Sequence, residues 1–188
     1  MKEDLEFYRY RIDGNDIIRQ VSRNWQKFLD QNDGPSNLAE RNIVGKSIWD
    51  YISGKETIQL YKIVFEKVRR NQKELKIPFR CDSPDIKRYL TLSLIPAPGN
   101  GIDFVSRIIK TEKRASVELL RNDIKRSKEM INMCSMCKKI RISGNRWEEI
   151  ETAIDELNLF HGRVLPEISH GICPACFADV MKNIGQLE

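Results

Sequence analysis

Four of the five cysteines form two Cys-x-x-Cys pairs, and these pairs constrain the fold of this chain more than any other feature. The first pair is Cys134 and Cys137, and the second is Cys173 and Cys176, with 35 residues between them. A Cys-x-x-Cys loop presents two sulfurs on one side, and two such loops together supply four soft ligands for a tetrahedral zinc ion. We therefore predict that these cysteines bind one structural Zn²⁺, which stabilises a segment too short to build a large core.

Other uses of the cysteines fit this pattern less well. A redox dithiol needs only one Cys-x-x-Cys pair, whereas an iron–sulfur cluster also takes four cysteines, and both alternatives stay open. Covalent haem attachment requires a histidine directly after the second cysteine, where Lys138 and Phe177 stand. His170 is the alternative ligand in place of one sulfur, and His161 is predicted to be a loop residue. Four protein sulfurs leave no open position for a substrate, which indicates a structural site.

The composition is that of a globular protein. The chain has 188 residues, of which 40% are hydrophobic and 31% charged, and this excludes a disordered class. No apolar run approaches the roughly 20 residues that span a bilayer, so no membrane association is expected. The first residues are charged and lack the apolar stretch of a secretory signal. We expect a cytoplasmic protein, because thiols stay reduced there.

The first 110 residues predict an α+β domain. Residues 7–22 read as a hairpin, because Tyr8, Tyr10 and Ile12 alternate with polar residues before Gly14. Helices are predicted within 23–32, 42–54 and 55–72, and strands within 74–83, 87–98 and 102–109. This order of two strands, helices and three strands places the helices on one face of a five-stranded, mostly antiparallel sheet.

This order, with the stretches "VSRNWQKFLDQN" and "IVGKSIWDYIS", resembles a PAS sensory domain over about residues 6–110. The resemblance implies a pocket between helices and sheet. Because both histidines lie outside this region and Cys81 falls in a predicted strand, a histidine-ligated haem or a covalent flavin adduct is not expected. Aromatic side chains either line a ligand cavity or simply fill the core, and the candidates are Trp25, Phe28, Trp49, Phe79 and Tyr89.

The segment 111–131 is predicted to be a connecting helix. It lacks Gly and Pro and is rich in helix formers. Val117, Leu120, Ile124 and Ile131 recur at spacings close to an a/d seam. Such a helix would join two copies into a homodimer through residues 113–131, or it would pack on its own sheet. The expected organisation is therefore a PAS-like domain over 1–110, a connecting helix over 111–131 and a zinc-binding domain over 132–188.

The sequence around the cysteines carries a second and more specific resemblance. Between the pairs, a strand over 138–142, a turn and a helix over 146–158 are expected, and another helix follows Cys176. The pattern "CSMCKKIRISGNRWEEIETAI … SHGICPAC" resembles a C-terminal module of bacterial signalling proteins, although "LNLFHGRVLPEI" departs from it. The resemblance implies a signalling accessory role. It says nothing of a catalytic activity.

Charge and motifs leave more than one function open. Residues 107–146 carry 12 basic and 4 acidic side chains, and residues 147–188 carry 2 and 8. A basic stretch beside a zinc unit is compatible with nucleic-acid binding, and paired thiols with a redox sensor. No nucleotide-binding or hydrolase motif is present, so we do not expect an enzyme. The favoured hypothesis is a sensor or adaptor whose zinc domain contacts another signalling protein.

Overall fold

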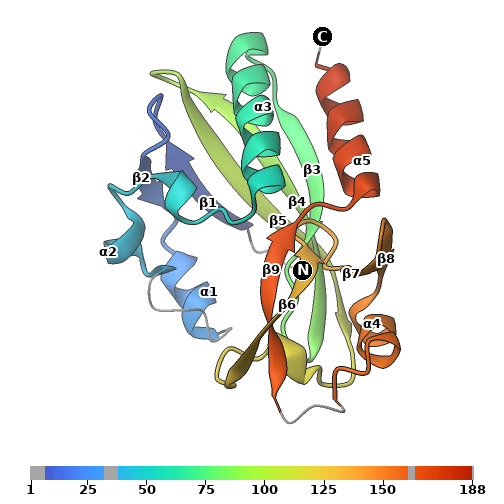
Figure 1. The fold of residues 1–188 in the computed structure, drawn as a ribbon. Coiled ribbons are helices and arrows are strands. Elements are labelled where there is room, and N and C mark those ends of the chain that lie inside the picture. Colours follow the sequence, from blue (N-terminus) through green and yellow to red (C-terminus); the bar gives the residue numbers. More distant parts are fainter. Residues whose placement is uncertain (1–6, 32–37, 161–163, 188) are drawn as a thin grey trace.

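Two β-sheets, with helices packed beside them, form an α+β fold (Figure 1). The computed structural model describes residues 7–31, 38–160 and 164–187 of the chain. The first sheet is antiparallel and five-stranded, as predicted, with the order β2-β1-β5-β4-β3. Its strands are β1 (Phe7–Ile12), β2 (Ile18–Val21), β3 (Leu75–Arg80), β4 (Ile86–Ala97) and β5 (Gly101–Lys113).

The local sequence specifies the hairpins of this sheet. The turn between β4 and β5 has Gly99 at φ +68° and Asn100 at φ +60°. Two consecutive positive φ angles are the signature of a type I′ turn, whose twist matches that of paired strands. Along β4, Leu90, Leu92 and Leu94 are buried, whereas the residues between them are more exposed. One face of the sheet therefore packs in the core, as the alternation predicts.

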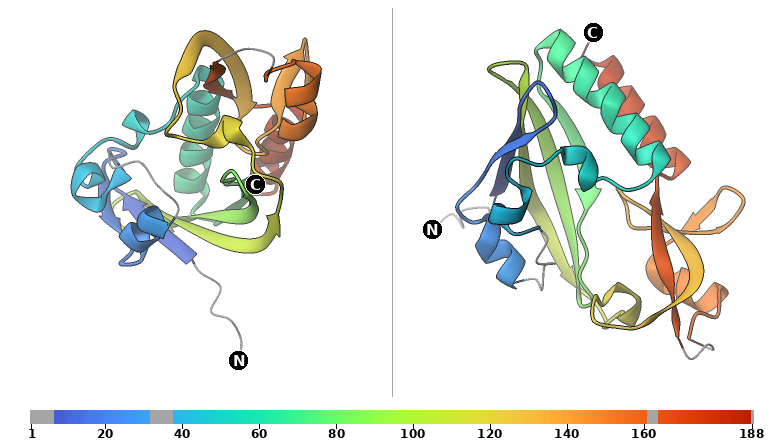
Figure 2. Two further views of the ribbon diagram at one scale, coloured as in Figure 1. Left: turned by 90° about the horizontal axis from the view of Figure 1, so that it is seen from below. Right: turned by 60° about the vertical axis from the view of Figure 1, so that its left-hand side comes forward.

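The helices between β2 and β3 cover that buried face (Figure 2). In the longest of them, the residues Leu60, Val64, Phe65 and Val68 form a buried stripe against the sheet. This helix ends at Gln72, which adopts a left-handed conformation with φ 52°. The elements are α1 (Trp25–Gln31), α2 (Glu40–Ile43), the 3₁₀ turn η2 (Ile48–Asp50) and α3 (Lys55–Asn71).

The predicted connecting helix over 111–131 is wrong. β5 continues to Lys113, which pairs with Ile86 of β4. After the short 3₁₀ turn η3 (Glu118–Leu120), the chain forms the strand β6 (Arg126–Cys134). Pairing with strands that are distant in sequence outweighs the helix propensity of these residues, which is a weak local preference.

The helical seam predicted for a homodimer is consequently absent from this segment. Val117 and Leu119 are buried in a second core of the same chain. Leu120, Ile124 and Ile131 pack partly buried against that core. A homodimer stays a prediction, but it has no basis in a coiled-coil helix.

β6 belongs to a second sheet of four strands, in the order β8-β7-β6-β9. β6 runs parallel to β9 and antiparallel to β7. Part of the helix expected over 146–158 is instead the strand β8, and β9 was not predicted. The elements are β7 (Ile140–Ser143), β8 (Arg146–Glu148), α4 (Ile150–Glu156), β9 (Leu165–Gly171) and α5 (Pro174–Gly185).

The hydrophobic core runs across the predicted boundary between the two parts. α5 lies beside α3 and packs against α3 and β3 (Figure 2). Its buried residues Val180 and Ile184 belong to the same core cluster as Leu60 and Ile77 of the first sheet region. A backbone hydrogen bond from Arg80 N–H to the Met136 carbonyl, at 2.7 Å, adds to this junction. The boundaries at 110 and 132 stay a prediction, but the packing is continuous there.

Ion pairs cluster where the first sheet meets α4, and those of Asp82 are buried within the first sheet. Asp82 is 1% exposed at its side chain and lies between Arg80 and Arg114, which are 7% and 5% exposed. Arg80 also pairs with Glu149 at 2.7 Å, and Lys87 pairs with Glu151 at 2.9 Å. Each buried charge has a partner, as the cost of desolvation requires.

Candidate metal centre

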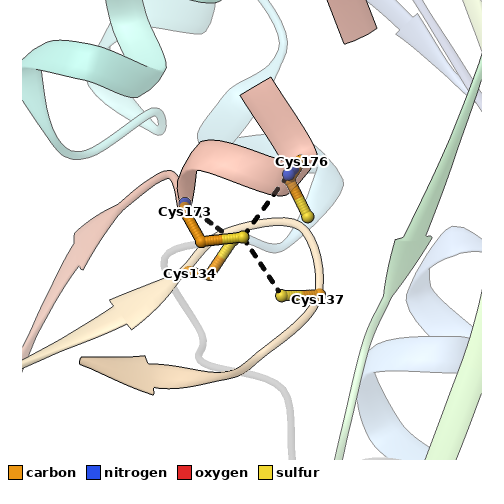
Figure 3. A group of neighbouring side chains, drawn as sticks. All are labelled: Cys134, Cys137, Cys173 and Cys176. Carbon is orange, nitrogen blue, oxygen red and sulfur yellow. Dashed lines mark hydrogen bonds between the residues drawn. The ribbon is translucent and has the colours of Figure 1, made fainter. Parts of the chain in front are cut away.

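The parallel pairing of β6 and β9 brings the two Cys-x-x-Cys pairs together. Cys134 is the last residue of β6 and is paired with Gly171, the last residue of β9. Parallel strands end at the same edge of a sheet, so the loops that follow them lie next to each other. Figure 3 shows the result, with Cys134 and Cys137 at the end of β6 and Cys173 and Cys176 at the start of α5.

Backbone hydrogen bonds hold the first cysteine loop in a tight turn. Lys138 N–H donates to the Cys134 carbonyl at 3.0 Å, and Cys134 N–H donates to the Lys139 carbonyl at 2.8 Å. Lys138 has φ 65°, which closes the turn. A third bond, from Ser135 N–H to the Gly171 carbonyl at 2.8 Å, joins this loop to β9. The loop is therefore positioned by backbone contacts on both sides.

The second pair opens helix α5. Cys173 is the N-cap residue, Pro174 follows in the first turn, and Cys176 N–H donates to the Cys173 Sγ at 3.4 Å. Proline suits this position because its missing N–H would lack a partner within the helix. Cys173 N–H in turn donates to the Cys134 Sγ at 3.4 Å. Such N–H donors stabilise negative charge on sulfur.

The four sulfurs fit around one ion. Their ligand atoms all lie within 4.8 Å of one another, and Cys137 Sγ lies 3.7 Å from Cys173 Sγ. A tetrahedral ion with bonds of about 2.3 Å to sulfur separates its ligands by about 3.8 Å. Cys134 and Cys173 are buried, and Cys137 and Cys176 are half-buried. The predicted thiols are thus brought together in an arrangement that can hold a metal ion.

The thiols of this cluster compete for negative charge. Hydrogen bonds from the Cys137 and Cys176 thiols lower the pKa of Cys134. The same interactions raise the pKa of Cys137 and of Cys176, because a second thiolate would lie beside the first. A divalent cation would offset this repulsion and allow all four groups to ionise, with release of protons.

Of the two histidines, His170 takes no part in this four-sulfur group. His170 lies on β9 and lines a small pocket beside the first cysteine loop. Partial burial there, and then Lys138, lower the pKa of His170. His161 lies outside the described residues. The candidate ligand group therefore consists of four sulfurs and does not include His170, the alternative ligand named in the sequence analysis.

Three of the aromatic residues predicted to line a ligand cavity, Trp25, Trp49 and Phe79, pack against the main core. The Trp25 ring meets Tyr10 edge-on at 6.0 Å, and the Trp49 ring lies 5.2 Å from Phe65. Phe79 is partly buried against the main core. These contacts place the side chains in the core under the helices, although their role as ligand contacts stays a prediction.

Tyr89 lies on the other face of the sheet. It neighbours Leu90 on β4, so the two side chains point to opposite faces, and its hydroxyl bonds to Glu112 at 2.9 Å. The side chain of Phe28 lies outside what the structure describes. A pocket of about 400 Å³ contains Trp49 but none of the other four candidates. A cavity lined by the candidates on the helix side of the sheet therefore stays a prediction.

A second pocket, which the sequence did not predict, adjoins the two loops that carry the cysteines. These loops, residues 134–138 and 172–176, are called the metal loops below. The pocket lies between the first cysteine loop, β9 and the start of α3, and its volume is about 260 Å³. Its lining residues come from positions 51–61, 135–138 and 170, so only the folded chain brings them together. The sequence signal was a group of hydroxyl-bearing residues around the start of α3, which by itself indicates no site.

No protein-family model matches the chain, and no curated protein matches it either. Among the described residues, none of the helices combines the length and the apolar character that crossing a membrane requires. The functional argument therefore depends on the geometry of the cysteines and on how they are joined to the first sheet.

Proposed function

We propose that this protein is a cytoplasmic signalling sensor or adaptor, in which a PAS-like domain is coupled to a structural zinc module that contacts another protein. The five-stranded antiparallel sheet, with helices between its second and third strands on one face, supports the PAS-like part. The cysteine motifs that resemble a signalling module support the second part. No catalytic role is proposed for either part.

One observation carries this proposal: the metal loops and the first sheet share a hydrophobic core. Cys134, Met136 and Cys173 belong to the same buried cluster as Leu75 and Phe104 of the first sheet. A change in the packing under α3 would therefore alter the contacts of the cysteine loops. A signal requires that a ligand favour one of two such arrangements.

Zinc is the metal that this donor set favours. Four thiolates that enclose one ion are typical of structural zinc, which is borderline-soft and accepts tetrahedral geometry. An iron–sulfur cluster would attach the cysteines to different iron atoms and would hold the sulfurs further apart. The close approach of Cys137 and Cys173, at 3.7 Å between sulfurs, supports a single ion.

The nucleic-acid alternative stays open, because most cations of the basic stretch are exposed and only some of them, such as Arg114 and Arg126, are used within the chain. Arg114 is 5% exposed and pairs with Asp82, and it also donates to the Ser83 carbonyl. Arg126 donates to the carbonyls of Pro166 and Leu119. These cations serve contacts within the chain and are not presented to a phosphate backbone. Titration of labelled duplex DNA at about 50 mM salt tests this alternative, because phosphate contacts are strongest at low salt.

Elemental analysis and native mass spectrometry of one purified sample test the metal assignment and the number of subunits. We expect one zinc ion per chain in the wild-type protein and in Cys81→Ser, whose altered residue lies outside the cluster. We expect none in Cys173→Ser. Iron with inorganic sulfide, or no metal in the reduced wild-type protein, would overturn the assignment.

Hydrogen exchange tests the coupling between the two parts. If the proposal is correct, removing the metal will speed exchange in α5 and also in the β3 and α3 amides that it contacts. The Cys81→Ser protein, which should keep its metal, provides the control. Faster exchange confined to residues after Arg126 would contradict a sensor coupled through the shared core.

A further inference from the structure

The small pocket beside the metal loops has the chemistry of an anion site. It is lined by five hydroxyl-bearing residues and by Lys138 and His170, and none of its lining residues is acidic. The hydroxyl groups come from Tyr51, Ser53, Thr57, Tyr61 and Ser135. Hydroxyl groups and the Lys138 ammonium together can donate many hydrogen bonds, and such donors are strongest toward a charged acceptor.

Lys138 supplies a positive charge without a carboxylate partner. Its Nζ donates to the Ser135 carbonyl at 3.0 Å, and no ion pair of Lys138 with another described residue is present. Lys87 and Arg114, in contrast, are each paired with acidic groups of the chain. The positive charge in the pocket is therefore available to a ligand.

A further donor points to the same ligand class. The Tyr61 side chain is half-buried, and in the described part of the chain its hydroxyl has no hydrogen-bond partner, while His170 lies at the exposed rim of the pocket. Burial raises the pKa of Tyr61 to about 12, so its hydroxyl keeps the proton that it would donate. Thr57 is 3% exposed, and its Oγ1 lies 3.3 Å from Ser135 Oγ, which joins α3 to the metal loop at the pocket wall.

The segments around the pocket are packed closely enough to hold these donors in place. Gly54 precedes α3 with φ 90°, and a Cβ at this position would lie 2.2 Å from the His170 carbonyl oxygen. Only glycine permits this contact between the start of α3 and β9. The positive end of a 17-residue helix thus begins beside the pocket and adds to its attraction for negative charge.

We propose that this pocket binds a small molecule that carries one carboxylate or phosphate group. The anionic oxygens would accept hydrogen bonds from Lys138 and from the hydroxyl groups other than that of Tyr51, which donates to the Asn42 carbonyl at 3.3 Å. The rest of the molecule would contact the Tyr51 and Tyr61 rings. The inference rests on the proposed function in one respect, namely that a metal ion fixes the loop that carries Ser135 and Lys138. A ligand here would touch the metal loop and α3 together, and would thus act at the junction of the two parts.

Three probes of similar shape test the proposal on the full-length, zinc-loaded protein. Benzoate carries a carboxylate, phenyl phosphate carries a phosphate, and benzamide is the neutral counterpart of benzoate. Isothermal titration gives the affinity, and shifts of backbone amide NMR signals locate the contact. We expect at least one anion to bind and to shift the amides of Thr57, Ser135 and Lys138, whereas benzamide should bind at least about tenfold more weakly.

A matched pair of variants separates the pocket from general electrostatics. Lys138→Gln removes the charge in the pocket, and Lys139→Gln removes the same charge from the next residue, which does not line it. Lys138→Gln should raise the dissociation constant about tenfold or more, and Lys139→Gln by less than about twofold. Tyr61→Phe, which keeps the ring and removes only the hydroxyl, should raise it about threefold to tenfold.

Each outcome has a distinct meaning once the zinc content of every sample is measured. Preference for benzoate or for phenyl phosphate supports the proposal and identifies the anionic group. Equal binding of benzamide, equal effects of the two lysine variants, or no binding at millimolar concentration in zinc-loaded protein would overturn it. An absence of metal from the wild-type protein would instead refute the proposed zinc module, and the two failures are thereby distinguished.

Discussion

The two sheets of this protein are stabilised in different ways. The first encloses a continuous core with large, fully buried side chains, among them Phe65, Leu94 and Phe104. The core enclosed by the second sheet, α4 and η3 contains fewer and smaller groups, including Val117, Leu119 and Ala153. Because a small core contributes less hydrophobic stabilisation, we expect the second region to depend more on the four thiols with their proposed ion, and on the ion pairs Arg80–Glu149 and Lys87–Glu151 that join α4 to the first sheet.

If the cysteine cluster holds zinc as proposed, loss of the metal should produce the largest difference between the two regions. Structural zinc contributes on the order of 10 kcal/mol to the folding of small domains, so Cys173→Ser should unfold the second sheet. Because α5 also packs on the first sheet, the thermal midpoint of that region should fall as well. Circular dichroism and tryptophan fluorescence measure both changes.

Cys81→Ser provides the control for that experiment. Cys81 is a free cysteine outside the four-sulfur cluster, so this variant should keep its metal and lose about 1 kcal/mol or less. An unchanged midpoint in reduced, metal-free protein would show that the second region is stable on its packing alone.

Neutralising Asp82 should have the next largest effect. Asp82→Asn leaves Arg80 and Arg114 buried without their shared carboxylate, and breaking a buried pair in this way costs about 3–5 kcal/mol. Urea unfolding measures the loss. Asp123→Asn removes an exposed pair with Arg121 and should leave stability unchanged within error. Equal effects of both variants would mean that the buried pairs of Asp82 do not stabilise the fold.

A matched pair of core truncations compares the two hydrophobic clusters directly. Leu94 and Leu119 are both 0% exposed, and each belongs to a different cluster. Leu94→Ala and Leu119→Ala should each cost about 2–5 kcal/mol, because each leaves a cavity. If the chain unfolds as one unit, both will shift a single transition. Two separate transitions, each sensitive to one variant, would show that the regions unfold independently.

Lowering the pH should have the smallest of these effects on stability, and it should act on the first sheet. Burial by itself would raise the pKa of Asp103, but hydrogen bonds from Arg11 and then Arg9 outweigh it and lower the pKa below the usual value. A lowered pKa stabilises the fold above about pH 4 and loses that contribution as pH falls further. Asp103→Asn should flatten this part of the stability profile, by about 1 kcal/mol or less because Arg9 is exposed. If the Asp103→Asn variant loses stability below pH 4 as steeply as the wild-type protein, Asp103 does not have this role.

The sequence was informative where structure depends on near neighbours. The strand alternation of Leu90, Leu92 and Leu94, the turn at Gly99 and the stripe of α3 all follow from local periodicity. The thiol cluster could also be predicted, because the Cys-x-x-Cys spacing reflects the needs of an ion. These features can be predicted without knowing which residues distant in the sequence come into contact.

The incorrect or missing predictions concern features that depend on contacts between residues distant in the sequence. Residues 126–134 have the composition of a helix, yet they form β6 because β9, more than thirty residues away, pairs with Arg126 and with residues 130–134. The pocket beside the metal loops was missed for the same reason, since Thr57, Lys138 and His170 meet only after folding. Local patterns do not contain such long-range partners.

The parallel alignment of β6 with β9 makes a bound ion a test of correct strand pairing. Cys134 faces Gly171, and Cys173 follows two residues later, so sliding either strand by one position would carry its sulfurs away from the other pair. A misaligned chain could engage an ion through two sulfurs at most. Metal binding would then favour the correct strand register over misaligned ones, because only the correct register brings all four sulfurs close enough to bind one ion.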